Sequence, residues 1–178
     1  MTRKSNDTYQ TPASAIEPLL PFITFNDANC LDPCRGAGNI IKTVQNYATC
    51  TSWNWCEIQE GIDYFAYKPT KRFDIVITNP PFFCWRKFLT KSLSEADLVI
   101  YLLRLNVLGS GVKTQRAKFW NNNPPTHLFP LEKRPSFTND GKTDGCDYAW
   151  YCWDIDGEEY HHKTISIKVP PGIHVLEA

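Results

Sequence analysis

The chain contains the stretch Phe73-Asp74-Ile75-Val76-Ile77-Thr78-Asn79-Pro80-Pro81-Phe82, in which an apolar, β-branched run stops at two consecutive prolines. Such a run predicts a buried strand over 73–78 that ends in a rigid loop. Proline has no backbone N–H and keeps the preceding residue extended, so the loop carbonyls can accept hydrogen bonds from a ligand. Asn79 adds a side-chain oxygen and Phe82 an aromatic face. These groups together suit a planar ring that carries an amino group.

On either side of this stretch, helix-like and strand-like segments alternate, and several strands follow near the end. The order predicts a single α/β domain over 1–178, a sandwich with a mostly parallel sheet. Pro18 interrupts the first helix, which is therefore expected to be short or kinked. Helices are predicted over 13–20, 39–47, 83–96 and 112–121, and strands over 30–33, 52–57, 73–78, 98–103, 126–131, 147–153 and 164–169.

Net charge, the length of apolar runs and the spacing of cysteines and histidines limit the classes of function that this chain could have. The 178 residues carry 19 basic and 19 acidic side chains, so any surface that binds nucleic acid must be local. No apolar run is long enough for a membrane span, and the first residues do not form a secretory signal, so the expected location is the cytoplasm. The seven cysteines show no C-x2-C spacing, and His161-His162 lie in a polar segment. We therefore expect free thiols and no metal site.

A glycine-containing loop follows the first predicted strand. Asp32-Pro33-Cys34-Arg35-Gly36-Ala37-Gly38 lies between that strand and the helix at 39–47, and Glu57 ends the next strand. Gly36 and Gly38 allow a tight turn and a close approach of a ligand to the backbone. Glu57 can accept both hydroxyls of a ribose. Asp32 disfavours a phosphate and favours a cationic ligand that carries an amino acid, although a turn or cap role for Asp32 is the structural alternative.

The proline loop resembles a known signature. Asn79-Pro80-Pro81-Phe82 looks like the catalytic Asn/Asp-Pro-Pro-aromatic loop of S-adenosylmethionine-dependent amino-methyltransferases. That resemblance implies a Rossmann-like class I methyltransferase sandwich with an antiparallel late strand, and S-adenosylmethionine as the cofactor. It also assigns the methionine end of the cofactor to Tyr9 and Thr11, in Tyr9-Gln10-Thr11-Pro12, and the cofactor adenine to Asp63 and Tyr64.

Later segments narrow the resemblance to small, phage-type DNA adenine-N6 methyltransferases. They are Leu102 to Ser110, Arg134-Pro135-Ser136-Phe137 and Thr143-Asp144 with Tyr148-Ala149-Trp150. The implied substrate is an adenine flipped out of duplex DNA, or unpaired in single-stranded DNA. Phe82 would stack on one face of this base and Phe137 on the other, although core packing is an equal alternative for Phe137.

Basic residues mark the candidate DNA surface. Lys113, Arg116 and Lys118 form a cluster on the helix after Gly109, and Arg134 could contact phosphate; a solvated helix face is the plainer alternative for the cluster. Restriction-system relatives usually carry a target-recognition domain, for which this chain has no room. Recognition is therefore expected to be short or relaxed, or to need a second subunit, as in a homodimer. RNA adenine or protein glutamine methylation, and a non-catalytic nucleic-acid-binding module, stay open.

Overall fold

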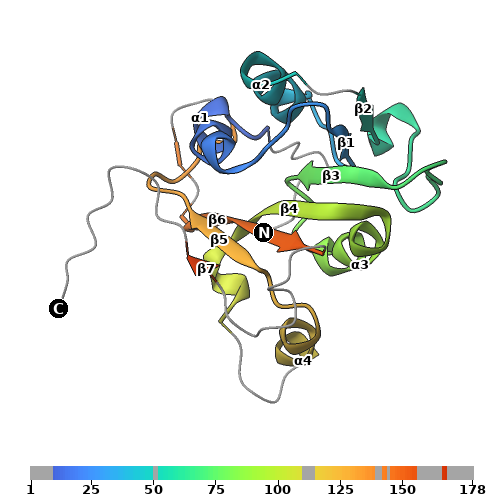
Figure 1. Ribbon diagram of the computed structural model, residues 1–178. Helices are drawn as coiled ribbons and strands as arrows, with labels where there is room; N and C mark the ends of the chain where they lie inside the picture. The colour runs from blue at the N-terminus through green and yellow to red at the C-terminus, as the bar shows by residue number, and fades with distance from the viewer. Residues whose placement is uncertain are drawn as a thin grey trace.

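Strand β3 (Phe73–Thr78) lies inside a seven-stranded sheet whose order is β2-β1-β3-β4-β6-β5-β7. The computed structural model describes residues 10–49, 52–109, 115–138, 142–143, 145–155 and 166–167. Its elements, which Figure 1 shows in place, are α1 (Ala13–Ile16), η1 (Glu17–Phe22), β1 (Asn29–Asp32), α2 (Asn39–Tyr47), β2 (Ser52–Trp55), η2 (Ile58–Glu60), β3, α3 (Trp85–Glu95), β4 (Ala96–Arg104), η3 (Leu105–Val107), α4 (Gln115–Asn122), β5 (His127–Pro130), β6 (Tyr148–Asp154) and β7 (Ser166–Ile167).

Strand direction confirms the predicted fold class. β2, β1, β3 and β4 pair in parallel, β6 pairs antiparallel with both β4 and β5, and β7 is parallel to β5. Among the described strands β6 is therefore the one that runs against the rest. The result is a Rossmann-like α/β sandwich with a mostly parallel sheet and an antiparallel late strand. Because parallel strands need crossovers, α2 and α3 connect neighbouring parts of the sheet.

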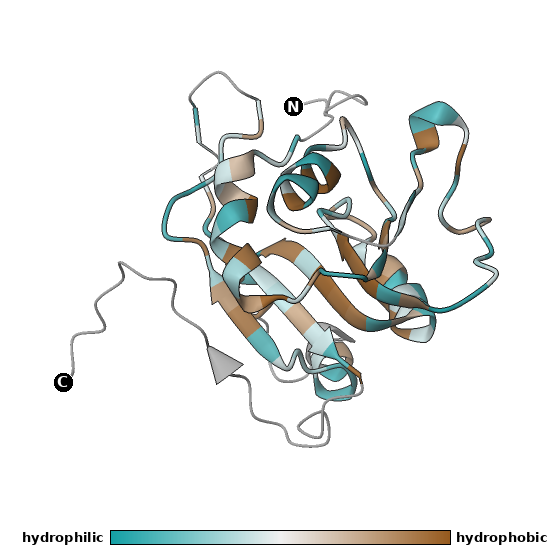
Figure 2. Cartoon of the chain, turned by 45° about the horizontal axis from the view of Figure 1, so that its top comes forward, coloured by the Kyte–Doolittle hydropathy of each residue, from teal (hydrophilic) through white to brown (hydrophobic). Residues whose placement is uncertain are grey.

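Two apolar clusters cover the two faces of the sheet, and β4 contributes to both by simple alternation. Ile100 and Leu102 belong to the cluster under α1, η1 and α2. Val99, Tyr101 and Leu103 belong to the cluster under α3 and α4. Successive side chains of a strand point to opposite faces, so a continuous apolar run is needed where both faces are covered. Figure 2 shows these hydrophobic residues gathered along the central strands, with hydrophilic residues on the outer helices.

The helices and strands differ little from the prediction, and the differences have local causes. α2 has the predicted bounds. The first helix changes at Glu17 into the 3₁₀ helix η1, which holds two prolines that cannot donate to an α-helical ladder. β2 ends at Trp55 rather than at residue 57, because Glu57 caps η2. Residues 112–114, 164–165 and 168–169 of the predicted elements lie outside the described residues.

No described helix has the length and apolar character that a bilayer crossing requires.

Candidate active site

The carboxyl ends of three adjacent strands bring the predicted site residues to one edge of the sheet. Asp32 is the last residue of β1, Asn79 follows β3, and Glu57 follows β2. β1 pairs in parallel with both β2 and β3, so these ends meet at the same edge. This edge, where β1 lies between β2 and β3, is the usual ligand position in open α/β sheets.

Asp32 is fully buried at the entrance of the glycine loop. Its Oδ1 accepts hydrogen bonds from the Cys34 backbone N–H at 3.1 Å and from the Thr78 hydroxyl at 2.7 Å. Its Oδ2 is also buried and has no partner among the described residues. Burial raises the pKa of the Asp32 carboxyl from 3.8 to about 7, against the opposing effect of the two hydrogen bonds. A cationic ligand would stabilise the ionised form of this buried carboxylate and could donate to its unpartnered oxygen.

The loop after Asp32 is held by Glu57. Gly36 and Gly38 adopt left-handed φ angles of 53° and 78°, which glycine reaches without strain. The Gly36 N–H donates to Glu57 Oε2 at 2.8 Å, and the Gln59 N–H donates to Oε1 at 3.0 Å. Pro33, in the same loop, is buried. Each carboxylate oxygen of Glu57 keeps a further lone pair, so the same group can position the loop and accept from a ribose.

Arg35 is a site residue that sequence reasoning missed. Its guanidinium carbon lies 4.0 Å from the centroid of the Trp55 ring, and the guanidinium also pairs with Glu60. The Arg35 backbone N–H donates to the Cys56 carbonyl at 3.1 Å, which ties the loop to the end of β2. A cation–π contact between a loop and a strand leaves no spacing pattern by which a sequence could reveal it.

Asn79 has a fixed orientation at the start of the proline loop. Its Nδ2 donates to the Thr11 hydroxyl at 3.1 Å, while its Oδ1 is buried and has no partner among the described residues. The Thr11 carbonyl accepts from Asn39 Nδ2 at 3.1 Å, so Thr11 also contacts the first residue of α2. A small hollow lies between the two loops and is lined by Gln10, Thr11, Cys34, Arg35, Ala37, Asn39, Ile40 and Asn79.

Pro80 and Pro81 follow Asn79, and the three residues together are here called the corner. Pro80 is buried and Pro81 half-buried. The Pro81 carbonyl accepts from the Cys84 N–H at 3.1 Å, whereas no described residue donates to the Pro80 carbonyl. The side-chain oxygen of Asn79 and the carbonyl of Pro80 therefore have no donor among the described residues, and their role as acceptors for a substrate stays a prediction. Among the described residues, no group of three or more His, Cys, Asp or Glu side chains could hold a metal ion.

Phe82 and Phe137 both pack around Tyr148. The Arg104 guanidinium lies 4.5 Å from the Phe82 ring centroid, and its Nε donates to the Tyr148 hydroxyl at 3.0 Å. Phe137 is only 4% exposed, and its ring meets Tyr148 edge-on at 5.1 Å. In this arrangement Phe137 is a core residue, and stacking on a base would require its loop to rearrange. The arginine over Phe82 was not predicted.

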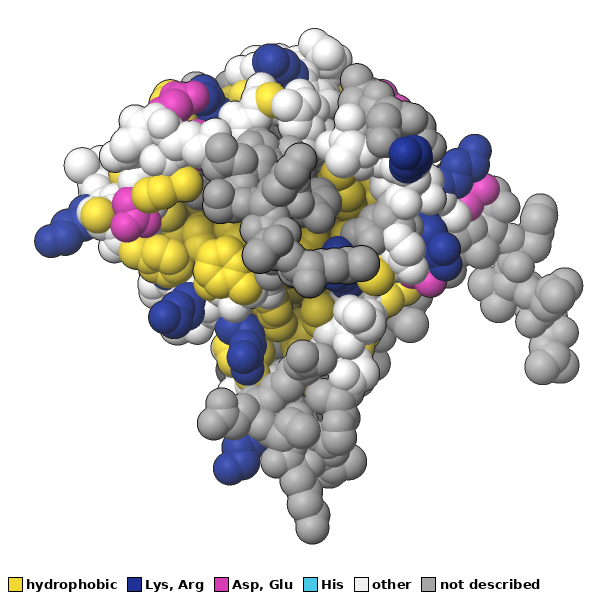
Figure 3. All heavy atoms as spheres, turned by 180° about the vertical axis from the view of Figure 1, so that it is seen from behind, with side chains coloured by type: hydrophobic (Ala, Val, Ile, Leu, Met, Phe, Trp, Pro, Cys, Tyr) yellow, Lys and Arg dark blue, Asp and Glu magenta, His cyan; other side chains and the backbone are white. Residues whose placement is uncertain are grey.

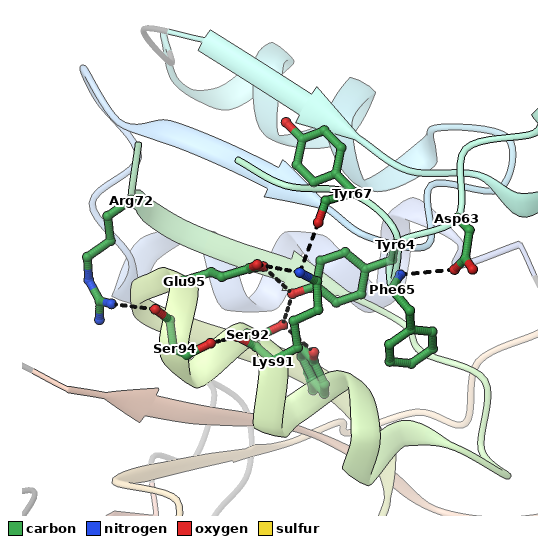
Figure 4. Close-up of polar contacts among 10 residues, drawn as sticks. Asp63, Tyr64, Phe65, Tyr67, Arg72, Lys91, Ser92, Ser94 and Glu95 are labelled. Carbon is green, nitrogen blue, oxygen red and sulfur yellow. Dashed lines mark hydrogen bonds and ion pairs between the residues drawn. The ribbon is translucent and has the colours of Figure 1, made fainter. Parts of the chain in front are cut away.

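Asp63 and Tyr64 serve local structure here. Asp63 is exposed, and its Oδ1 accepts from the Phe65 N–H at 2.9 Å. Tyr64 is 2% exposed, and its hydroxyl bonds Ser92 and Glu95, each at 2.9 Å (Figure 4). Desolvation by burial raises the Tyr64 pKa. The cofactor role that the resemblance assigned to these two residues stays a prediction.

We expect Tyr64→Phe to lower the free energy of unfolding by about 1–2 kcal/mol while the affinity for S-adenosylmethionine stays unchanged. The variant keeps the ring stacked on Phe88 but removes a hydroxyl that two buried or half-buried groups use. Urea unfolding and calorimetric titration would measure the two quantities. A large loss of cofactor affinity with unchanged stability would instead support the cofactor role.

The predicted nucleic-acid residues are spread over two regions. Lys118, on α4, is exposed. Arg134 is also exposed, and its Nε lies 2.8 Å from Asp147 Oδ1. Tyr9, Lys113 and the Arg116 side chain lie outside the described residues, so their predicted roles stay predictions.

No protein-family model matches this chain, and no curated protein matches it. Solved structures share its fold. The methyltransferase subunit of a type I restriction-modification system from Streptococcus thermophilus has a TM-score of 0.63 and 13% identity, over 91% of this chain and 47% of that one. A Listeria monocytogenes protein assigned to the class I S-adenosylmethionine-dependent methyltransferases has a TM-score of 0.61 and 13% identity, over 93% and 67%.

A Pyrococcus horikoshii protein assigned as an RNA methyltransferase has a TM-score of 0.56 and 16% identity, over 80% of this chain and 83% of that one. The chain thus has the α/β fold of class I methyltransferases. It spans about half the length of the restriction-modification subunit. At these identities the likeness concerns the fold, and the activity has to be argued from the site.

Proposed function

We propose that this chain transfers a methyl group from S-adenosylmethionine to the N6 amine of adenine in DNA. The observation that carries the proposal is the state of Asn79: its Nδ2 is anchored on Thr11, and its buried Oδ1 has no partner among the described residues. A buried acceptor without a donor costs free energy, so such an atom usually pairs with an ordered water, an ion or a ligand. An amino group is a donor that fits.

The residues at the edge of the sheet fit the cofactor. The Oδ2 of Asp32 has no partner among the described residues and can accept a hydrogen bond from a ligand. Burial without a counter-charge raises the pKa of the Asp32 carboxyl, so the ammonium or sulfonium charge of S-adenosylmethionine would stabilise its ionised form. Gly36 and Gly38 let the backbone approach the ligand, and Glu57 has lone pairs left for the ribose. When bound, the cofactor supplies an electrophilic methyl group.

The protein contributes position and hydrogen bonding at the amine. The lone pair of an adenine amine is delocalised into the ring, which makes it a poor nucleophile. Acceptance of its two N–H bonds by Asn79 Oδ1 and the Pro80 carbonyl would favour a pyramidal nitrogen with a localised, more nucleophilic lone pair. Asn79 takes no proton, because an amide is not basic at neutral pH. After the transfer the thioether S-adenosylhomocysteine is the leaving group, and the cationic, acidic nitrogen loses its proton to solvent water.

The target adenine must leave the base stack, or be unpaired already, to reach this corner. A base inside a duplex cannot reach it, so the adenine is flipped out or already unpaired. The ring of Phe82 is the stacking surface at the corner. DNA is supported as the substrate by the similarity of the fold to a restriction-modification methyltransferase subunit.

Transfer of tritium from labelled cofactor would test the proposal. We expect unmethylated DNA to accept label, with N6-methyladenine as the product after digestion to nucleosides. DNA already methylated at every adenine N6 position is the matched control, and it should accept none. Labelling of protein in place of nucleic acid, or of cytosine in place of adenine, would overturn the proposal.

RNA is the second candidate substrate. The Pyrococcus horikoshii protein assigned as an RNA methyltransferase matches this chain over 83% of its own length, so the two are similar in size. The corner at Asn79 recognises an amine and does not by itself distinguish ribose from deoxyribose. RNA as acceptor in the same assay, with N6-methyladenosine as product, would favour this candidate over DNA.

A further inference from the structure

The proline loop ends in a tight turn that carries two neighbouring phenylalanines, one packed against the protein and one exposed. The Cys84 N–H donates to the Pro81 carbonyl at 3.1 Å, so Phe82 and Phe83 are the central residues of a β-turn. Phe82 packs inward against Tyr148. Phe83 is 81% exposed, the highest value among the exposed large hydrophobic residues that the structure describes. It lies four residues after Asn79 on the same loop.

The turn leads directly into α3, whose first turn fixes it to the body of the molecule. Trp85 is 6% exposed and packs against Phe119 and Trp120. Arg86 and Lys87, the next two residues, are exposed and form no ion pair with a described residue. The sequence from 79 to 94 contains no Asp or Glu. Figure 3 shows one face of the molecule, where Lys and Arg side chains, and some Asp and Glu side chains, lie around an area of hydrophobic side chains.

We propose that Phe83, Arg86 and Lys87, here called the turn surface, form a nucleic-acid contact. Phe83 stacks on, or inserts beside, the base next to the target adenine, and Arg86 and Lys87 bind the flanking phosphates. Aromatic rings and cations side by side are the combination that binds unstacked nucleic acid, and apolar side chains can wedge between bases. This inference rests on the proposed function and names a surface that the sequence analysis did not assign.

The rigidity of the turn supports this role. Two prolines precede it, the Cys84 N–H closes it, and buried Trp85 anchors it, so little conformational entropy remains to be lost on binding. A single exposed apolar residue is common on proteins and alone implies nothing. Phe83 is distinguished by its position on the loop that holds Asn79 and by Arg86 and Lys87, three and four residues further along the chain, which form no ion pair with a described residue. Positive charge at Arg86 and Lys87 attracts the phosphates of a nucleic acid, whereas it would not attract a neutral or basic protein.

Three variants and one matched control test the turn surface by fluorescence anisotropy with labelled single-stranded and duplex DNA. Phe83→Ala should weaken DNA binding by about tenfold or more, and Phe83→Trp should retain it, since base stacking on an aromatic ring is lost only in the first. Arg86→Gln with Lys87→Gln should reduce the slope of log affinity against log salt by about 2. Tyr47→Ala, which truncates a 56% exposed ring at the far end of α2, should change neither.

Cofactor affinity and melting temperature separate a contact role from a structural one. Both should stay at the wild-type values in Phe83→Ala, because the ring contacts solvent. Unchanged DNA binding by Phe83→Ala, an equal loss in Tyr47→Ala, or a parallel loss of cofactor binding would each overturn the inference. These results would leave the proposed function standing if the wild type still methylates adenine in DNA. Failure of the wild type to methylate DNA would count against the proposed function instead.

Discussion

Asn79→Ala is expected to abolish methyl transfer, with a loss of at least about 10²- to 10³-fold in kcat, the scale on which removal of one transition-state hydrogen-bonding group acts. The substitution deletes the buried Oδ1 that would accept from the amine, and it also frees the Thr11 hydroxyl. Cofactor affinity should change little, because Asp32 and the glycine loop stay in place. Single-turnover transfer and calorimetric titration of the cofactor would measure the two effects.

Asn79→Asp is the matched control. It keeps an oxygen acceptor at the same position, and the Thr11 hydroxyl can donate to the new carboxylate. We expect this variant to retain a measurable fraction of the activity that Asn79→Ala loses. Wild-type activity in Asn79→Ala would show that the methyl acceptor is held elsewhere. Equal losses of activity and cofactor affinity would show that the loop had collapsed.

Asp32→Asn is expected to weaken S-adenosylmethionine binding by about tenfold or more while making the cofactor-free protein more stable. The amide keeps the size of the side chain but cannot balance the positive charge of the ligand. Replacing the carboxylate also removes the cost of burying a negative charge without a cation. That same cost raises the pKa of Asp32 to about 7 in the wild type. A higher melting temperature together with a weaker cofactor affinity would identify Asp32 as a binding residue.

The pH dependence of stability has a definite sign. The Asp32 carboxyl has a pKa of 3.8 when unfolded and about 7 when folded, so between these values the folded state keeps a proton that the unfolded state releases. Its contribution therefore makes the cofactor-free protein less stable as pH rises from 4 to 7. In Asp32→Asn that decline should be smaller by about 2–4 kcal/mol. Cofactor affinity of the wild type should rise over the same range, because ionised Asp32 is the form that binds a cation.

The sequence predicted the layout of the sheet well because burial on both faces leaves a strong signal. β3 and α2 have the predicted bounds, since prolines end one and a glycine precedes the other. The 3₁₀ helix η1 was harder to foresee. Pro18 and Pro21 show that an α-helix cannot continue, but they do not say which conformation replaces it.

The candidate site was predicted as a set of residues, not as a set of contacts. Motif spacing placed Asp32, Glu57 and Asn79 at strand ends, because parallel strands end at one edge. The direction of a side chain depends on distant packing, so the sequence left base stacking and core packing as equal alternatives for Phe137 and did not indicate that Tyr64 is buried. For the same reason nothing in the sequence indicated that Arg104 lies over Phe82.

Thr11 connects two loops that lie far apart in the chain. Its carbonyl accepts from Asn39 at the start of α2, and its hydroxyl accepts from Asn79 beside the prolines. A ligand that displaces either partner disturbs the other, so occupation of one half of the hollow should change the affinity of the second half. Thermodynamic reciprocity then requires an equal effect in both directions. Thr11 thus provides a route for coupling between the two halves of the hollow, through its backbone carbonyl on one side and its hydroxyl on the other.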